Sequence, residues 1–405
     1  MDGTALLDAL LTPEGSADPY PLYARARELG PVAPARDGIL LVSSYRTARQ
    51  LLRDPGFGVM DRTFREAADP EFLTHASHRM TSASLLELNP PDHGRIRSLL
   101  TAVFTARRVA TLGQTVTAIV ERLLDELAEL AADGDPVDFM DAFAFRLPVA
   151  VICELLGVPQ QDGFQFRQLA SAASASMESA VRPDELRRAD TAADELGDYF
   201  AELTARRRAR PQDDLVSALV QVADADPGRL SAFELLSTLV LLLLAGFETT
   251  TGLLGTGIEL ALRHPGIAAG LRSGRITSAG FTDEVLRYDT PVQVAERVPL
   301  RDGMRVEGWP AARGSSVLLL LGGANRDPDR FERADVFDPT RRDNLPLSFG
   351  GGAHFCLGAQ LARMEAQIAF PAVLARFPGL RADGVPVRRN RMVLRGYQTL
   401  LVTLG

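Results

Sequence analysis

Residues 349–358, with the sequence FGGGAHFCLG, restrict the possible fold of this chain more than any other stretch. The three consecutive glycines let the backbone pass close to a flat ligand, where a side chain would collide. The loop brings Cys356 to the expected start of a helix, whose unpaired N–H groups and positive dipole end favour a thiolate over a thiol. Such a thiolate can ligate a haem iron. A cysteine in this position can also be an inert core residue, and the cysteine alone does not decide between the two.

The composition limits the kind of protein that carries this loop. The chain has 405 residues, of which 46% are hydrophobic, enough for a sizeable core. A formal net charge of −8 argues against non-specific binding to nucleic acid. All 44 basic residues are arginine, which excludes chemistry that needs a lysine Schiff base or a P-loop lysine. The other cysteine, Cys153, lies in the apolar run 149–153 and is expected in the core, so no disulfide framework is predicted.

The sequence carries no recognisable targeting signal. The N-terminal residues lack the basic stretch and long apolar segment that are typical of a signal peptide. The longest uninterrupted apolar stretch, residues 239–247, is far shorter than the roughly 20 residues that span a bilayer. We therefore expect a cytoplasmic protein without a membrane anchor.

Residues 230–263 have the strongest helical pattern, with leucines on several faces, which predicts a buried central helix. Glu248 and three consecutive threonines interrupt it, and a buried glutamate is costly unless it has partners or a function. Ala245 and Thr249 lie on one face, where a small residue leaves room for a ligand and a hydroxyl can hold water or dioxygen. The alternative is a hydroxyl-lined bend with a hydrogen-bonded glutamate.

Two further pairs of residues have helical spacing. His93 and Arg97 are four residues apart after two prolines, so they share a face and can bind an anion such as a haem propionate. The alternative is an exposed helix start with ordinary charges. Glu284 and Arg287 can form an ion pair, but such pairs are common on surfaces and carry little information alone.

The spacing F-G-G-G-A-H-x-C-x-G resembles the haem-binding loop of the cytochrome P450 family. Other family motifs follow in the expected order, namely P-P-D-H-x-R-x-R, A-G-x-E-T, E-x-x-R and F-D-P-x-R. The resemblance extends from about residue 18 to residue 402, and the short, glycine-rich region 272–281 departs from it without touching a motif. It implies a mainly α fold with small β-sheets (α+β), in which the haem is buried between the long central helix and the cysteine loop. It also implies a single domain, 1–405, with a small β-rich region at about 30–45 and 292–320.

The resemblance assigns roles to individual residues. Cys356 is implied as the thiolate ligand of haem b, and Glu248 and Thr249 as the catalytic pair that guides protons to dioxygen, the co-substrate. The residues expected to hold the haem are His93, Arg97, Arg297, Phe349 and His354. A structural lock of Glu284, Arg287 and Arg341 is expected to fix the segment that leads to Cys356. The residues expected to line the substrate pocket, with the irregular segment 54–88 closing over it, are Leu86, Leu241, Leu244, Ala245, Val292, Val294 and Tyr397.

The implied activity is that of a haem-thiolate monooxygenase, which inserts one oxygen atom of O2 into a small apolar organic substrate by hydroxylation or epoxidation. The arginine-rich, lysine-free composition resembles bacterial enzymes that tailor natural products such as polyketides in secondary metabolism. Electrons are expected from NAD(P)H through a separate ferredoxin and ferredoxin reductase, and the protein is expected to be a monomer. Candidate arginines for ferredoxin docking are Arg95, Arg107, Arg108 and Arg363.

Two other functions fit a haem protein. A peroxide-driven P450 usually lacks the acid–threonine pair, so Glu248 and Thr249 argue against it. A haem protein that only binds or senses gases is the second alternative, and the sequence contains nothing that resembles an output domain.

Overall fold

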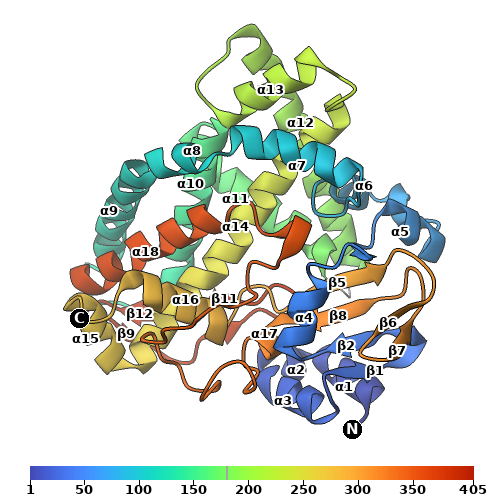
Figure 1. Ribbon diagram of the computed structural model, residues 1–405. Helices are drawn as coiled ribbons and strands as arrows, with labels where there is room; N and C mark the ends of the chain where they lie inside the picture. The colour runs from blue at the N-terminus through green and yellow to red at the C-terminus, as the bar shows by residue number, and fades with distance from the viewer. Residues whose placement is uncertain (179–180) are drawn as a thin grey trace. The chain divides into compact units, whose positions relative to one another are not determined.

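A computed structural model describes residues 1–178 and 181–405 of the chain (Figure 1). The chain forms two compact units, and each contains segments that are far apart in sequence. Unit 1 consists of Met1–Gly58, Val120–Arg146 and Thr249–Gly405, and unit 2 consists of Val59–Ile119 and Leu147–Glu248. Most of the chain is helical and the sheets are small, as predicted.

The main sheet of unit 1 has five strands in the order β1-β2-β8-β5-β3. Strands β1 and β2 form an antiparallel hairpin, β2 runs parallel to β8, and β5 runs antiparallel to β8 and β3. Both predicted β-rich stretches therefore contribute to this sheet. The strands are β1 (Val32–Pro34), β2 (Leu40–Val42), β3 (Phe57–Gly58), β5 (Val294–Pro299) and β8 (Val317–Leu320), and a separate hairpin joins β6 (Met304–Val306) to β7 (Trp309–Ala311).

Four short N-terminal helices belong to unit 1. Side chains of preceding residues cap three of them: Asp2 accepts a hydrogen bond from the backbone of α1, Thr12 from α2, and Ser44 from α4. Leu6, Leu10 and Tyr23 from these helices pack with Leu41 and Leu320 of the sheet to form one hydrophobic core. The helices are α1 (Gly3–Leu10), α2 (Pro13–Ala17), α3 (Tyr20–Glu28) and α4 (Tyr45–Leu51), and a 3-10 turn, η1 (Arg36–Gly38), joins β1 to β2.

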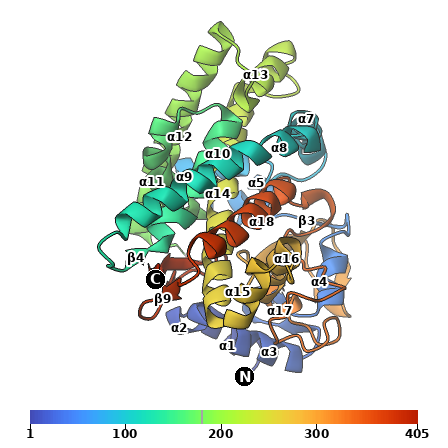
Figure 2. The same ribbon diagram turned by 90° about the vertical axis from the view of Figure 1, so that its left-hand side faces the viewer.

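The C-terminal helices of unit 1 pack around α18, which contacts α15 and α16 (Figure 2). Phe281 of α16 meets Phe370 of α18 edge to face, with ring centroids 5.0 Å apart. Gly257 of α14 allows this ring to approach closely, since an added Cβ would lie 2.2 Å from Cζ of Phe370. These elements are α14 (Ala232–Arg263), whose second half belongs to unit 1, α15 (Pro265–Arg272), α16 (Ser278–Tyr288), α17 (Leu321–Ala324), η6 (Gly352–His354) and α18 (Ala359–Arg376).

Residues 392–403, whose sequence pattern predicts a closing hairpin, do not form one. Strand β11 (Tyr397–Thr399) pairs with β10 (Val387–Arg388), whereas β12 (Leu401–Thr403) pairs with β4 (Val137–Asp138) and β9 (Arg381–Ala382). Leu400 between them is fully buried, and its carbonyl accepts a hydrogen bond from the Phe139 backbone at 2.9 Å. The two strands therefore find partners that are distant in sequence and not each other.

Unit 2 is helical. The longest helix that lies wholly within this unit is α12 (Pro183–Ala209), which contacts α6, α11 and α13. The segment 54–88 is less irregular than predicted, because it forms α5 (Arg62–Ala68), η2 (Phe72–Thr74) and α6 (Ala76–Ser82). Each of these is too short to produce a clear hydrophobic period. The other elements are α7 (Asp92–Val103), α8 (Ala106–Thr111), α10 (Arg146–Leu156), η4 (Gln160–Asp162), α11 (Gly163–Ala173), η5 (Ser174–Met177) and α13 (Leu215–Ala225). Between the segments of unit 2 run α9 (Gly113–Leu130) and the π-helix η3 (Met140–Ala144).

Helix α14 is 32 residues long, and by length and composition alone it could cross a membrane, with a mean hydropathy of 1.7 in its most apolar window. Half of that window is buried inside the protein, and the helix also buries the polar side chains of Glu248, Thr250 and Thr251. Long core helices of soluble proteins meet the same criteria. The prediction of a buried central helix is confirmed by Leu239 and Leu243, which are both fully buried.

Candidate active site

The cysteine loop of unit 1 is shaped by its own backbone. The Cys356 amide donates to the Phe349 carbonyl at 3.0 Å, which closes the loop. Gly350 and Gly352 have φ angles of 70° and 65°, a conformation that glycine adopts without strain. A Cβ at Gly352 would also lie 2.3 Å from the Leu52 carbonyl oxygen, so a larger residue does not fit. Cys356 is exposed, in contrast to the buried Cys153.

The elements that follow the loop orient Phe349. Helix α18 begins at Ala359, three residues after the cysteine. Arg363 of this helix places its guanidinium 4.4 Å from the centre of the Phe349 ring and donates through Nε to Asp283 at 2.9 Å. The aromatic side chain therefore packs against a cation that is itself held by a carboxylate on α16.

The expected lock residues lie together in unit 1. Arg287 donates to Glu284 from both Nε and Nη2 at 2.8 Å, and Arg341 Nε donates to the same carboxylate at 3.2 Å. The side chains of Glu284 and Arg287 are 0% exposed. Arg287 also donates to three backbone carbonyls between 2.7 and 3.1 Å, those of Asn325, Ala334 and Val336. A fully desolvated pair of this kind needs all of these hydrogen bonds to be stable.

Hydrogen bonds connect α16 directly to the start of the cysteine loop. The Ser348 hydroxyl donates to the Leu286 carbonyl at 2.6 Å and accepts from the Asn325 side chain at 2.9 Å. Asn325 in turn accepts from the Leu347 amide at 2.7 Å. Asn344 adds a hydrogen bond to Glu284 at 3.0 Å. The chain that leads to Cys356 is therefore attached to the helix that carries the lock.

Arg297 of β5 is a buried cation. Burial lowers the pKa of Arg297 to about 10, and the neighbouring Glu296 only partly offsets this. Its guanidinium donates to the Glu296 carbonyl at 2.7 Å. Among the described residues no carboxylate forms an ion pair with it. A haem propionate would supply the missing negative charge, so Arg297 fits the group that the resemblance implies.

The other candidate residues of unit 1 lie on several elements. Val294 is buried in β5, and Val292 is half-buried and forms an isolated β-bridge with Leu394. Tyr397 is buried in β11 beneath the guanidinium of Arg388, which lies 3.8 Å from the ring centre, and burial raises the Tyr397 pKa above its usual range. His354 ends the 3-10 turn η6, two residues before the cysteine.

Unit 2 carries the other anion-binding candidates on α7. His93 is buried and Arg97 is half-buried, one turn apart, as the spacing predicts. Arg95 between them donates to Asp92 at 2.8 Å and to Glu234 at 2.6 Å. Arg95 therefore pairs with carboxylates of the protein, and it lies on a different face of α7 from His93 and Arg97, the two candidates for binding the haem.

Glu248 is buried at the end of unit 2 and accepts a hydrogen bond from the Ser174 hydroxyl at 3.3 Å. Ser174 is also fully buried and lies in η5, within the Ala- and Ser-rich region 160–200. The sequence did not single out Ser174, because one serine among many small residues carries no distinguishing pattern. Thr249, the next residue, is the first residue of α14 in unit 1.

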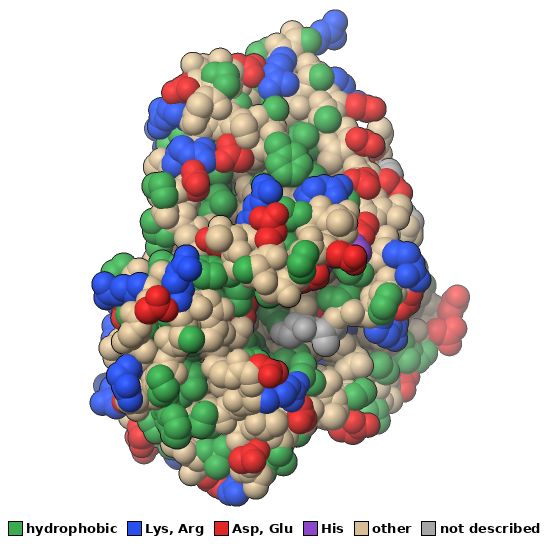
Figure 3. All heavy atoms as spheres, turned by 90° about the vertical axis from the view of Figure 1, so that its right-hand side faces the viewer, with side chains coloured by type: hydrophobic (Ala, Val, Ile, Leu, Met, Phe, Trp, Pro, Cys, Tyr) green, Lys and Arg blue, Asp and Glu red, His purple; other side chains and the backbone are tan. Residues whose placement is uncertain are grey.

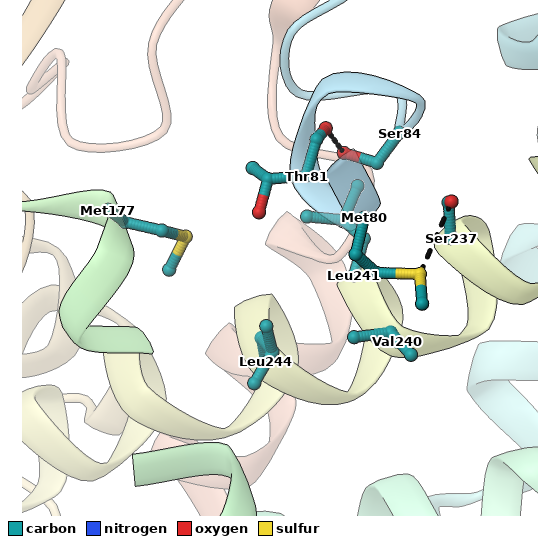
Figure 4. A pocket seen from close by; sticks show the side chains of 8 residues that line it. All are labelled: Met80, Thr81, Ser84, Met177, Ser237, Val240, Leu241 and Leu244. Atoms are coloured by element: carbon teal, nitrogen blue, oxygen red, sulfur yellow. Dashed lines mark hydrogen bonds between the residues drawn. The ribbon is translucent and has the colours of Figure 1, made fainter. Parts of the chain in front are cut away.

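A cavity with about 200 Å³ of empty space lies within unit 2 (Figure 4). Leu241 and Leu244, which were predicted to line a pocket, form part of its wall. Leu86, also predicted, is 44% exposed and is not among the lining residues. Ala245 directly follows one of them in α14. The sequence analysis missed the six other lining residues, namely Met80, Thr81, Ser84, Met177, Ser237 and Val240. Ser237 and Val240 could have been found by helical spacing from Leu241 and Leu244.

Known proteins resemble this chain over almost its whole length. The sequence model of the family described as Cytochrome P450 matches residues 280–395. Cytochrome P450 monooxygenase PikC from Streptomyces venezuelae is 40% identical over 376 residues, which cover 92% of this chain and 86% of that protein. The 6-deoxyerythronolide B hydroxylase of Saccharopolyspora erythraea is 37% identical, and the match covers 96% of each chain.

The fold agrees with these relatives. The ligand-free structure of CYP164A2 from Mycobacterium smegmatis superposes with a TM-score of 0.88 at 37% identity, covering 98% of this chain and 99% of that one. A second structure of that protein has econazole bound. Identity at this level over nearly full length establishes the family, whose members use a haem with a cysteine thiolate ligand, O2 and electrons from NAD(P)H. The chain belongs to the cytochrome P450 family and is a haem-dependent monooxygenase.

Proposed function

We propose that Cys356 is the thiolate ligand of the haem and that His93, Arg97, Arg297 and His354 bind its propionates, beside Phe349. The observation that carries this proposal is the exposed cysteine on a backbone that is hydrogen-bonded to a buried lock. When bound, the haem activates dioxygen, and electron donation by the thiolate favours O–O cleavage. One oxygen atom enters the substrate and the other leaves as water.

We further propose that Glu248 and Thr249 deliver the protons for this reaction. A buried carboxyl group that accepts from Ser174 can hold a proton without bulk water around it. The Thr249 hydroxyl follows directly in the chain and can pass or orient the proton. Glu284, Arg287 and Arg341 have the structural role of holding the backbone that precedes Cys356.

The substrate that this cavity favours is an apolar organic compound with hydroxyl groups. Its wall consists of methionine, leucine and valine side chains and three hydroxyls. Thr81 donates to the Ser77 carbonyl at 2.9 Å, Ser84 to the Thr81 carbonyl at 2.6 Å, and Ser237 to the sulfur of Met80 at 3.3 Å. Because each hydroxyl already donates its proton within the protein, only its lone pairs are available to a substrate. These lone pairs can accept a hydrogen bond from a substrate hydroxyl, whereas a substrate carbonyl would find no donor.

A bacterial natural product such as a polyketide fits this description, and one relative is named for hydroxylating 6-deoxyerythronolide B. Spectral titration with 6-deoxyerythronolide B and a derivative in which a hydroxyl is oxidised to a ketone tests this. Equal affinities would contradict recognition of the O–H group.

Bacterial members of the family generally take electrons from a ferredoxin and its reductase. For this chain we infer a cytoplasmic monomer that uses such partners. On the face shown in Figure 3, acidic and arginine side chains are interspersed, which suits transient protein contacts better than nucleic-acid binding. Arg95, Arg108 and Arg363 are ion-paired with Glu234, Asp213 and Asp283, whereas Arg107 is exposed. Arg107→Glu should raise the ferredoxin KM, and an unchanged KM would remove this site from the interface.

Replacement of Cys356 tests the central assignment. The Cys356→Ala holoenzyme should lose the red-shifted carbon monoxide band of thiolate-ligated haem, and Cys153→Ala should keep it. Survival of the band in Cys356→Ala would overturn the assignment. With 18O2 and the ferredoxin system, wild-type product should carry one labelled oxygen atom. Equal turnover with hydrogen peroxide alone would instead favour a peroxide-driven enzyme.

A further inference from the structure

Helix α6 forms one wall of the cavity in unit 2, and a side chain of another helix caps its first turn. The N-cap residue His75 makes no capping hydrogen bond of its own. Instead, Asp190 of α12 accepts from the Ser77 amide at 3.0 Å and from the Ser77 hydroxyl at 2.7 Å. The other oxygen of Asp190 lies 2.7 Å from Nδ1 of His75. One carboxylate thus satisfies a backbone donor that the short helix leaves unpaired.

The same face of α12 receives the other end of α6. Gly197 lies seven residues, or two turns, after Asp190 and therefore on the same face of the helix. A Cβ at Gly197 would lie 3.2 Å from Cε of Met80, so the thioether rests against the bare backbone of α12. The sulfur of Met80 also accepts a hydrogen bond from Ser237 of α14 at 3.3 Å. Figure 4 shows this bond and the position of Met80 across the cavity from Met177.

We propose that Asp190 is a positioning residue that sets the size of ligand the cavity admits. By capping α6 it holds the cavity-lining residues Met80, Thr81 and Ser84 in place, and Gly197 supplies the space that Met80 needs. The side chains of His75 and Asp190 are 31% and 21% exposed, so this contact contributes little to global stability. Its effect is local, because it determines the positions of the side chains that form the cavity wall.

This inference rests on the proposed function in that the cavity is taken as the substrate pocket, but its first test has a readout on α6 itself and does not depend on the roles of Cys356 and Glu248. In the Asp190→Asn holoenzyme, amides of residues 77–82 should exchange hydrogen about tenfold faster, because the cap is weakened. Asp194→Asn is the matched control, since this aspartate lies on the same helix and is exposed. Unchanged exchange in Asp190→Asn, or equal acceleration in both variants, would overturn the proposal.

Ligand size provides the second readout, with imidazole as the small probe and econazole as the large one. In Asp190→Asn, the spectral shift with econazole should develop about tenfold faster, and the shift with imidazole should keep its rate. A purely structural defect would change both probes together. Equal changes for the two azoles would therefore contradict control of size by α6.

Gly197→Ala tests the same wall in the opposite direction. Alanine is compatible with a helix, but its methyl group would displace the Met80 side chain. Because the free space beside Met80 is the cavity, the displaced side chain should make the cavity smaller. Econazole affinity should fall about fivefold or more while imidazole affinity is unchanged. Adding Met80→Ala to this variant should restore econazole binding. Failure of the double variant to recover, or full econazole affinity in Gly197→Ala, would overturn the role of this contact even if Asp190→Asn does not fold.

Discussion

Two carboxylates, Glu284 in unit 1 and Asp190 in unit 2, hold functional segments in different ways. Glu284 is 0% exposed and is bound by the permanent charges of Arg287 and Arg341. Asp190 is partly exposed and is bound by His75 and Ser77. The first contact cannot open without leaving a charge buried, whereas the second can open at the cost of a few hydrogen bonds that water replaces.

The difference in burial between the two contacts corresponds to a difference in the segments that they hold in place. The lock of Glu284 supports the backbone that leads to Cys356, and the haem ligand proposed there must keep its position through every catalytic cycle. The cap by Asp190 supports a cavity wall, which has to adapt to a substrate that enters and leaves. In this chain the segment that leads to Cys356 is thus held by enclosed charge, and the cavity wall is held by weaker contacts.

The comparison predicts the largest effect for Arg287→Ala. Removal of one partner of a buried pair leaves Glu284 uncompensated and should cost about 3–5 kcal/mol of the free energy of unfolding. Urea unfolding followed by circular dichroism measures this, and the haem content of the purified protein should fall with it. Arg376→Ala is the control, because its pair with Asp125 is exposed and contributes little. Similar losses in both variants would break the distinction between enclosed and exposed contacts.

Glu248 is, like Glu284, a buried carboxylate, but its proposed role is proton transfer and not support of the fold. Glu248→Gln should lower product formation by about 10²-fold, since an amide cannot transfer a proton. Ser174→Ala should have a smaller effect in the same direction, seen as less product per NAD(P)H consumed. Ser176→Ala is the control, as its hydroxyl donates to the Ala173 carbonyl in the same turn. Unchanged coupling in Ser174→Ala would show that this hydroxyl does not serve Glu248.

The cap by Asp190 should depend on pH only in acid. Burial opposes its ionisation, but hydrogen bonds from His75 and Ser77 outweigh this and lower the pKa of Asp190 below its usual range. A depressed pKa contributes stability that is fully present above the unfolded pKa of about 3.9 and is lost as the pH falls through the folded pKa. The exchange difference between wild type and Asp190→Asn should be constant from pH 8 to pH 5 and decline only as the pH falls below about 3.9. His75 and His78 lie beside this carboxylate, and a large change between pH 8 and pH 5 would show that neighbouring groups dominate.

The smallest predicted effect concerns the reactivity of the two cysteine thiols, which differ in burial. Burial, aided by the charge of Asp162, raises the pKa of the Cys153 thiol to about 12. In the Cys356→Ala variant, iodoacetamide at pH 8 should therefore leave the folded protein unmodified and add one group after unfolding in urea. Mass spectrometry distinguishes these outcomes. Rapid modification of the folded protein would show that the core around Cys153 opens readily.

Motif spacing predicted those parts of the site that depend on local geometry. His93 and Arg97 are one turn apart on α7, Glu284 and Arg287 are paired on α16, and the glycine loop leads into α18. The cap by Asp190 could not be predicted, because 113 residues separate it from Ser77 and neither residue has a distinctive neighbour. Ser174 was missed for the same reason.

By itself the sequence determined the family, the buried central helix and the position of the cysteine, since each depends on residue types at short, fixed spacings. Tertiary structure alone decided which strands pair at the C-terminus, which backbone carbonyls accept hydrogen bonds from Arg287 and which residues outside α14 line the cavity. Leu400 is buried between β11 and β12 because β10, β4 and β9 supply their partners, and those contacts join segments that no local pattern connects. The glycine loop thus predicts where the haem ligand lies in the sequence, while the proposed role of α6 and α12, in setting which molecules the cavity of unit 2 admits, emerged only from their packing.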